Sequence, residues 1–182
     1  MLYHISKTAG LKTLKPQYST HKKPYVYATE NIVTGLLFGA SHDDFDFMID
    51  EEDGRPVVIE CYPNAFYQIF KDRACSVYEV AEDGFMRGMT PWTPELVSEN
   101  EVKVIRETIV EDLYSRLLEE EAQGNLAIRR YKENADYKHI VSEHIVDRLI
   151  RSDAVYTEDK RIKEHYGKLI DALQEIMDGH LL

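Results

Sequence analysis

Two residues near the beginning of the sequence carry side chains that together could hold a nucleotide. His4 lies within residues 2–6 (LYHIS) and Tyr27 within residues 25–29 (YVYAT). Both runs are rich in the β-branched and aromatic residues typical of strands. An aromatic ring offers a stacking face and an imidazole offers a hydrogen bond. On adjacent strands these two side chains would form a slot for a flat, charged base.

The elements that must position these residues are predominantly β in the first part of the chain. The composition predicts strands over residues 2–6, 24–28, 45–49, 56–62, 76–81, 95–98 and 102–109. Asp53-Gly54 predicts a hairpin turn, because a type I′ turn needs positive φ at both central residues. Apolar spacing predicts a helix over residues 30–40, with Thr29 as its N-cap, and a shorter helix over residues 64–70.

From residue 110 onward the pattern becomes helical. Apolar stripes predict helices over residues 110–124, 127–134, 137–152 and 157–178, with Gly124 and Gly179 as stop signals. We therefore expect an α+β protein: residues 1–109 form a mixed, mostly antiparallel sheet region, and residues 110–182 form a helical extension. The extension either packs on the first region or serves partner contacts, and its apolar stripes are compatible with a homodimer.

Length and composition restrict the function classes. The chain has 182 residues, of which 43% are hydrophobic and 30% charged, a balance typical of a soluble globular protein with one core. No apolar run approaches the roughly 20 residues needed to span a bilayer, so we expect no membrane partner and a cytoplasmic location. A net charge of −11 argues against nonspecific nucleic-acid binding, which depends on Lys and Arg.

Several alternative sites receive little support from the sequence. The carboxylates between Asp43 and Asp53 do not follow the spacing of an EF-hand loop, so we interpret them as a solvated turn and predict no metal site. Cys61 and Cys75 lie in apolar contexts and are predicted to be buried free thiols. Glycine-rich phosphate loops, the Gly-x-Ser-x-Gly elbow and the His-Glu-x-x-His zinc motif are all absent.

A third residue, Glu95, begins the predicted strand over residues 95–98. The order of His4, Tyr27 and Glu95 resembles the ADP-ribosyltransferase superfamily, in particular the branch with poly(ADP-ribose) polymerases and many small bacterial transferases. The signature of that branch is a His, a Tyr and a Glu on three separate strands. The resemblance covers about residues 1–109 and implies a split β-sheet of the ADP-ribosyltransferase type.

The resemblance implies a reaction and a role for each residue. NAD would be the substrate, with His4 hydrogen-bonded to a ribose hydroxyl and Tyr27 stacked on the nicotinamide. Glu95 would polarise a ribose hydroxyl and favour the cationic charge that develops as nicotinamide leaves. Ser6 and Thr29 would complete the NAD-binding positions. Thr93 stands where arginine-modifying members carry an acidic residue or Gln, which argues against an arginine acceptor.

The residues leave several alternatives open. Glu60, Glu79 and Glu99 also lie in or beside predicted strands, so each is a further candidate for the catalytic acid. The same scaffold could instead be a non-catalytic binding module that recruits a protein partner through its helical half. A third reading is a structural or phage-encoded interaction protein whose acidic surface mimics nucleic acid. The acceptor of the transferase reading is not identified by the sequence.

Overall fold

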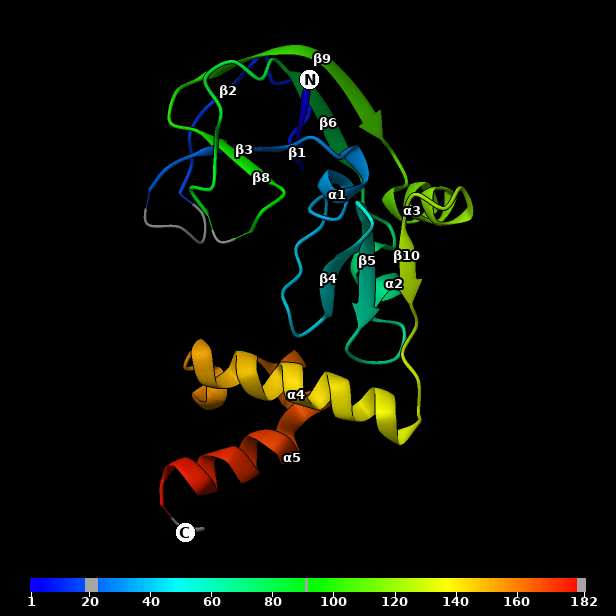
Figure 1. Ribbon diagram of the computed structural model, residues 1–182, viewed down its shortest axis with the longest axis vertical. Coiled ribbons are helices and arrows are strands. Elements are labelled where there is room, and N and C mark those ends of the chain that lie inside the picture. The colour runs from blue at the N-terminus through cyan, green and yellow to red at the C-terminus, as the bar shows by residue number, and fades with distance from the viewer. Residues whose placement is uncertain (19–22, 91, 180–182) are drawn as a thin grey trace. The chain divides into compact units, whose positions relative to one another are not determined.

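The computed structural model describes residues 1–18, 23–90 and 92–179, which form two compact units (Figure 1). Unit 1 comprises residues 1–41, 51–57 and 67–127, and unit 2 comprises residues 42–50, 58–66 and 128–182. The chain therefore passes from one unit to the other several times. This division differs from the single boundary at residue 109 that the change of pattern predicts. The fold class is α+β, as expected.

The main sheet of unit 1 has seven strands in the order β2-β9-β6-β1-β3-β8-β7. Every strand pairing recorded within it is antiparallel. The mostly antiparallel sheet predicted from the sequence is thus confirmed. The strands are β1 (Leu2–Ser6), β2 (Thr13–Leu14), β3 (Val26–Thr29), β6 (Cys75–Val80), β7 (Met86–Arg87), β8 (Glu95–Ser98) and β9 (Val102–Val110).

Alternation along these strands builds the core of unit 1. Leu2 opposes Val80, and Ala28 opposes Leu96, so apolar side chains of neighbouring strands meet on one face of the sheet. The cluster on this face is almost fully buried and consists of Leu2, Leu14, Val26, Ala28, Tyr78, Val80, Leu96 and Val102. Burial of these strands supplies the hydrophobic stabilisation that holds β1, β3 and β8 side by side.

Helix α1 (Ile32–Leu36) follows β3 directly but is shorter than predicted. Its N-cap is Asn31, whose Oδ1 accepts hydrogen bonds from the backbone N–H groups of Val33 at 2.9 Å and Thr34 at 3.3 Å. The predicted cap, Thr29, is therefore wrong. Thr29 belongs to β3, and its hydroxyl accepts from the Asn31 N–H at 3.3 Å. An Asn side chain placed two residues later competes successfully for the first helical N–H groups.

Helix α1 packs against helix α3 (Leu113–Ala122). Gly39, which follows α1, lies against the first residue of α3 and the first residue of β6. A Cβ atom added to Gly39 would lie 2.7 Å from Leu113 Cδ2 and 3.0 Å from Cys75 Sγ. Leu113 is fully buried, so its side chain has no free space into which it can move. Only glycine fits at this position.

The hairpin predicted at Asp53-Gly54 is confirmed by its backbone. Strands β4 (Phe47–Glu52) and β5 (Arg55–Glu60) flank Asp53 and Gly54, whose φ angles are 52° and 77°. Positive φ at both positions is the requirement of a type I′ turn. The two strands form a three-stranded sheet in the order β10-β5-β4.

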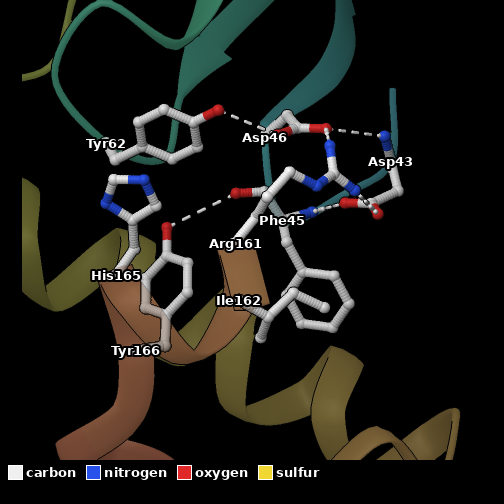
Figure 2. Close-up of a pocket in the computed structure, with 8 residues that line it drawn as sticks. All are labelled: Asp43, Phe45, Asp46, Tyr62, Arg161, Ile162, His165 and Tyr166. Carbon is white, nitrogen blue, oxygen red and sulfur yellow. Dashed lines mark hydrogen bonds and ion pairs between the residues drawn. The ribbon is translucent and has the colours of Figure 1, made fainter. Parts of the chain in front are cut away.

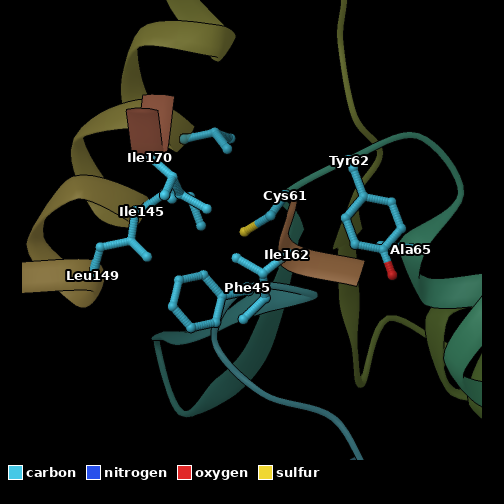
Figure 3. Packing of buried hydrophobic residues seen from close by; sticks show 9 residues of the cluster. Phe45, Cys61, Tyr62, Ala65, Ile145, Leu149, Ile162 and Ile170 are labelled. Atoms are coloured by element: carbon cyan, nitrogen blue, oxygen red, sulfur yellow. The ribbon is translucent and has the colours of Figure 1, made fainter. Parts of the chain in front are cut away.

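Unit 2 has its own apolar core, in which helices α4 (Ala135–Arg151) and α5 (Lys160–Met177) supply most of the side chains (Figure 3). A short 3₁₀ turn, η1 (Ala154–Tyr156), joins them, and its Val155 is fully buried. Part of each apolar stripe therefore packs in this core, whereas Ile140, Ile150 and Ile176 are exposed. The buried cluster consists of Phe45, Cys61, Tyr62, Ala65, Val141, Ile145, Leu149, Ile162 and Ile170.

The helix predicted over residues 127–134 is wrong. Ala127–Arg129 forms strand β10 instead, and Asn134 caps α4 through a hydrogen bond from the Tyr137 N–H to its Oδ1 at 2.8 Å. Tertiary partners override the local pattern here. The Tyr131 N–H donates to Glu60 Oε2 at 2.9 Å, and the Tyr137 hydroxyl donates to the Arg129 carbonyl at 3.0 Å. Helix α2 (Ala65–Phe70) lies close to its predicted position.

The packing around Gly39 predicts opposite effects for two glycine substitutions. Gly39→Ala should lower the free energy of unfolding by about 1–3 kcal/mol, because its Cβ overlaps buried neighbours. Gly167→Ala lies inside α5 with no heavy atom within 4 Å of the new Cβ and should raise it by about 0.5–1 kcal/mol. Urea denaturation of both variants measures the difference, and a neutral Gly39→Ala would contradict the packing described.

Candidate functional site

The structure places the three predicted catalytic residues on three neighbouring strands. His4 lies in β1, Tyr27 in β3 and Glu95 at the first position of β8. These strands are adjacent in the sheet order, with β3 between the other two. Residues that are far apart in the chain are therefore brought to neighbouring strands. The registers place His4 on the core face of the sheet, with Leu2 and Ala28, and place Tyr27 and Glu95 on the opposite face.

The imidazole of His4 connects β1 to β3. The strands pair through Tyr3 and Thr29, and His4 Nδ1 lies 2.7 Å from the carbonyl oxygen of Tyr27. A carbonyl can only accept, so Nδ1 carries the proton and donates. Burial lowers the pKa of His4 below its ordinary value of 6.5, with the Tyr27 carbonyl opposing this shift. The ring is therefore neutral at pH 7, and its Nε2 is an acceptor.

Tyr27 and Glu95 lie on one face of the sheet. Tyr27 opposes Val97, and Thr29 opposes Glu95. Tyr27 and Glu95 are consequently diagonal neighbours, a relation that separates their backbones by about 7–8 Å. Burial raises the pKa of the Tyr27 phenol above its ordinary value, and the negative charge of Glu95 is the second cause. Both side chains are partly exposed, so a ligand can reach them.

The remaining predicted positions, Ser6 and Thr29, serve local structure. The Ser6 hydroxyl accepts from the Thr8 N–H at 3.1 Å, which turns the chain at the end of β1. Thr29 is only 5% exposed, and its methyl group lies 3.1 Å from the Cβ position of Gly35. Ser6 remains partly exposed, whereas Thr29, the last residue of β3, is buried against α1.

The other carboxylates considered as the acid have structural partners. Glu60 is 2% exposed, and its two oxygens accept from the N–H groups of Phe66 and Tyr131, each at 2.9 Å. Glu79 accepts from Arg106 Nε at 2.8 Å, and Glu99 lies 3.6 Å from Lys23 Nζ. None of the three is recorded as an electrostatic neighbour of Tyr27, whereas Glu95 is. Among these carboxylates, Glu95 is the one whose charge acts on Tyr27.

A second group of polar residues, in unit 2, was not anticipated from the sequence (Figure 2). Asp46 is almost fully buried, and its carboxylate accepts from the Tyr62 hydroxyl at 2.9 Å and from the Asp43 N–H at 3.1 Å. Arg161 of α5 lies 3.4 Å from both the Asp46 and Asp43 carboxylates. The solvated-turn interpretation therefore holds for the exposed residues near Asp53 but not for Asp46.

Packing around Asp46 leaves no room for a substrate. The rings of Tyr62 and His165 stack at 3.9 Å with an angle of 6° between their planes, and the cavity holds only about 10 Å³ (Figure 2). That volume accommodates roughly one water molecule. Tyr166 closes the group by donating to the Cys61 carbonyl at 2.7 Å. We interpret the group as a polar connection that fixes α5 to the loop before β4.

The described part of the chain contains neither a group of metal ligands nor a helix that could span a membrane. Within residues 1–18, 23–90 and 92–179, no group of three or more His, Cys, Asp or Glu side chains could hold a metal ion. No helix of these residues is long and apolar enough to cross a bilayer.

Burial raises the pKa of Cys61 to about 12 and that of Cys75 to about 11, so both thiols are unreactive at neutral pH.

Comparisons with known proteins return no relative. No protein-family model, no curated protein and no solved structure matches this chain. Functional inference therefore depends on the geometry of the chain itself.

The buried, neutral His4 predicts a pH dependence of stability. Because its folded pKa lies below the unfolded value of 6.5, its contribution is complete above that value and is lost as the pH falls through the folded pKa. The melting temperature of the native protein should drop more between about pH 7.5 and about pH 5.5 than that of His4→Asn, which cannot titrate in this range. Equal drops of the melting temperature in calorimetric scans would show that folding does not shift the pKa of His4.

The polar group in unit 2 predicts that Arg161 stabilises the fold. Arg161→Ala removes the cation from the almost fully buried Asp46 and should lower the free energy of unfolding by about 1–3 kcal/mol. Arg151→Ala is the matched control, because Arg151 makes only an exposed ion pair with Asp147 at 2.7 Å and should change stability by less than about 0.5 kcal/mol. Similar losses in both variants, measured by urea denaturation, would contradict the assignment.

Proposed function

We propose that this protein transfers ADP-ribose from NAD to an acceptor, with His4, Tyr27 and Glu95 as its catalytic set. The observation that carries the proposal is the adjacency of the three residues on β1, β3 and β8. A hydrogen-bonding imidazole, an aromatic ring and a carboxylate are the groups that nicotinamide-ribose cleavage needs. Strand β3 lies between β1 and β8, so each of the three residues stands on a strand next to at least one of the others.

Each group would act on a different part of NAD. Nε2 of the neutral His4 would accept a hydrogen bond from a ribose hydroxyl, while Nδ1 stays on the Tyr27 carbonyl. Tyr27 would stack on the cationic nicotinamide ring. Glu95 would accept from a second ribose hydroxyl and place its negative charge beside the anomeric carbon. Removing such a charge commonly costs about 100-fold or more in rate.

The proposed reaction breaks one bond and forms one. The bond between the anomeric carbon and the nicotinamide nitrogen breaks, and both of its electrons leave with nicotinamide. The sugar develops oxocarbenium character, which the carboxylate of Glu95 stabilises more strongly than the ground state. A lone pair of the acceptor then attacks the anomeric carbon, and the acceptor loses its proton to solvent. Water as acceptor would give free ADP-ribose.

The proposal predicts that removing the charge of Glu95 without changing its size removes activity but not binding. Glu95→Gln should lower nicotinamide release from NAD by about 100-fold or more. NAD should still raise its melting temperature, because the stacking and hydrogen-bonding groups remain. Glu99→Gln is the matched control: Glu99 lies just beyond β8, pairs only with Lys23 across the surface, and should leave release unchanged.

Two results would reject the transferase. Nicotinamide release that is equally fast in Glu95→Gln and in the native protein would show that Glu95 has no catalytic role. Absence of both release and NAD-dependent stabilisation in the native protein would favour the alternative, a non-catalytic binding module that recruits a partner through its helices. The observation behind that alternative is the exposure of large apolar side chains on α4 and α5, among them Ile140, Ile150 and Ile176.

A further inference from the structure

A pocket of about 340 Å³ lies in unit 1, where the segment after β1 meets the turns that follow α1 and α2. Its walls are made of small residues: Gly39, Ala40, Ser41 and Ala74. Two long cationic side chains, Lys7 and Arg73, line it as well. The small side chains leave the pocket open, and the two cations give it positive charge.

The two cations of this pocket have no carboxylate partner among the residues that the structure describes. Lys7 Nζ donates to the Ser41 hydroxyl, which holds the ammonium group at the pocket wall. In the described part of the chain neither Lys7 nor Arg73 forms an ion pair with a carboxylate. The one acidic residue of the lining, Asp72, lies 4.0 Å from Lys71 Nζ instead. Among the described residues, the pocket therefore holds two cations without paired carboxylates, in a chain whose net charge is −11.

The backbone around the pocket is held in place. The Arg73 carbonyl accepts from the Leu113 N–H at 2.8 Å, and the Arg73 N–H donates to the Phe70 carbonyl at 3.3 Å. Beyond Lys7, the Tyr78 hydroxyl donates to the Thr8 carbonyl at 2.7 Å and fixes the segment that leaves β1. Hydrogen bonds thus fix the backbone at or next to both cationic residues, which reduces the conformational entropy lost when their side chains bind a ligand.

We propose that this pocket binds a phosphoryl group, either an inorganic phosphate or the diphosphate of a nucleotide. Guanidinium and ammonium groups are the preferred donors to phosphate oxygens, and the Ser41 hydroxyl adds a third donor. A volume of about 340 Å³ lies at the lower end of ligand pockets, which suits a small charged group better than an extended molecule. The inference does not depend on the proposed transferase activity.

The test is a calorimetric titration with pyrophosphate at low salt, without NAD. The native protein should show one saturable site, and the double variant Lys7→Gln/Arg73→Gln should bind at least about tenfold more weakly. The matched control is Lys12→Gln/Lys103→Gln, which removes the same charge from exposed residues that do not line the pocket. Competition by ADP would identify a nucleotide as the source of the group, and pyrophosphate binding without competition would identify an inorganic anion.

Asp72 permits a gain-of-affinity variant. Asp72 has a φ of 55°, a left-handed conformation that Asn also accepts readily, so Asp72→Asn should fold normally. Removing its negative charge from the pocket lining should tighten pyrophosphate binding by about two- to fivefold. No binding by the native protein, equal weakening in both double variants, or unchanged affinity in Asp72→Asn would each overturn the proposal. A thermal melt of each variant without ligand establishes that it is folded.

Discussion

The hydrogen bond from His4 Nδ1 to the Tyr27 carbonyl is the contact on which the candidate site depends. It joins β1, the central strand of the sheet, to its neighbour β3 at 2.7 Å, just beyond the backbone pairing of Tyr3 with Thr29. The bond determines which ring nitrogen is protonated, and burial keeps the ring neutral. An imidazole held in this way presents one defined acceptor, Nε2, whereas a freely rotating His would present either nitrogen.

The strand pattern of the first part of the chain was predictable because burial on one face of a sheet imposes alternation. Predicted strands at residues 2–6, 76–81 and 95–98 agree with β1, β6 and β8 to within one residue. The segment at residues 127–134 was not predictable in this way. Its backbone is satisfied by Glu60 and β5, partners that are remote in the chain, so its local helical pattern carried little weight.

The candidate site was predictable as an order of residue types but not as a geometry. His4, Tyr27 and Glu95 each lie in a strand that the sequence pattern predicts. The order of the strands depends on which strands pair, and the sequence of a single strand does not reveal its partners. Asp46 shows the opposite case. Its acidic neighbours indicated a solvated turn, whereas Tyr62 and Arg161 enclose its carboxylate in the folded unit. A buried carboxylate is recognised only when its donors, distant in sequence, are brought to it.

The central claim, that His4 is a neutral, oriented acceptor in a nucleotide site, is tested most directly by nitrogen NMR of its ring. The shifts of Nδ1 and Nε2 distinguish the tautomers and follow protonation with pH. The account predicts a proton on Nδ1, a pKa below 6.5, and a change confined mainly to Nε2 when NAD is added. A proton on Nε2 in the neutral ring, or a spectrum unaffected by saturating NAD, would contradict it.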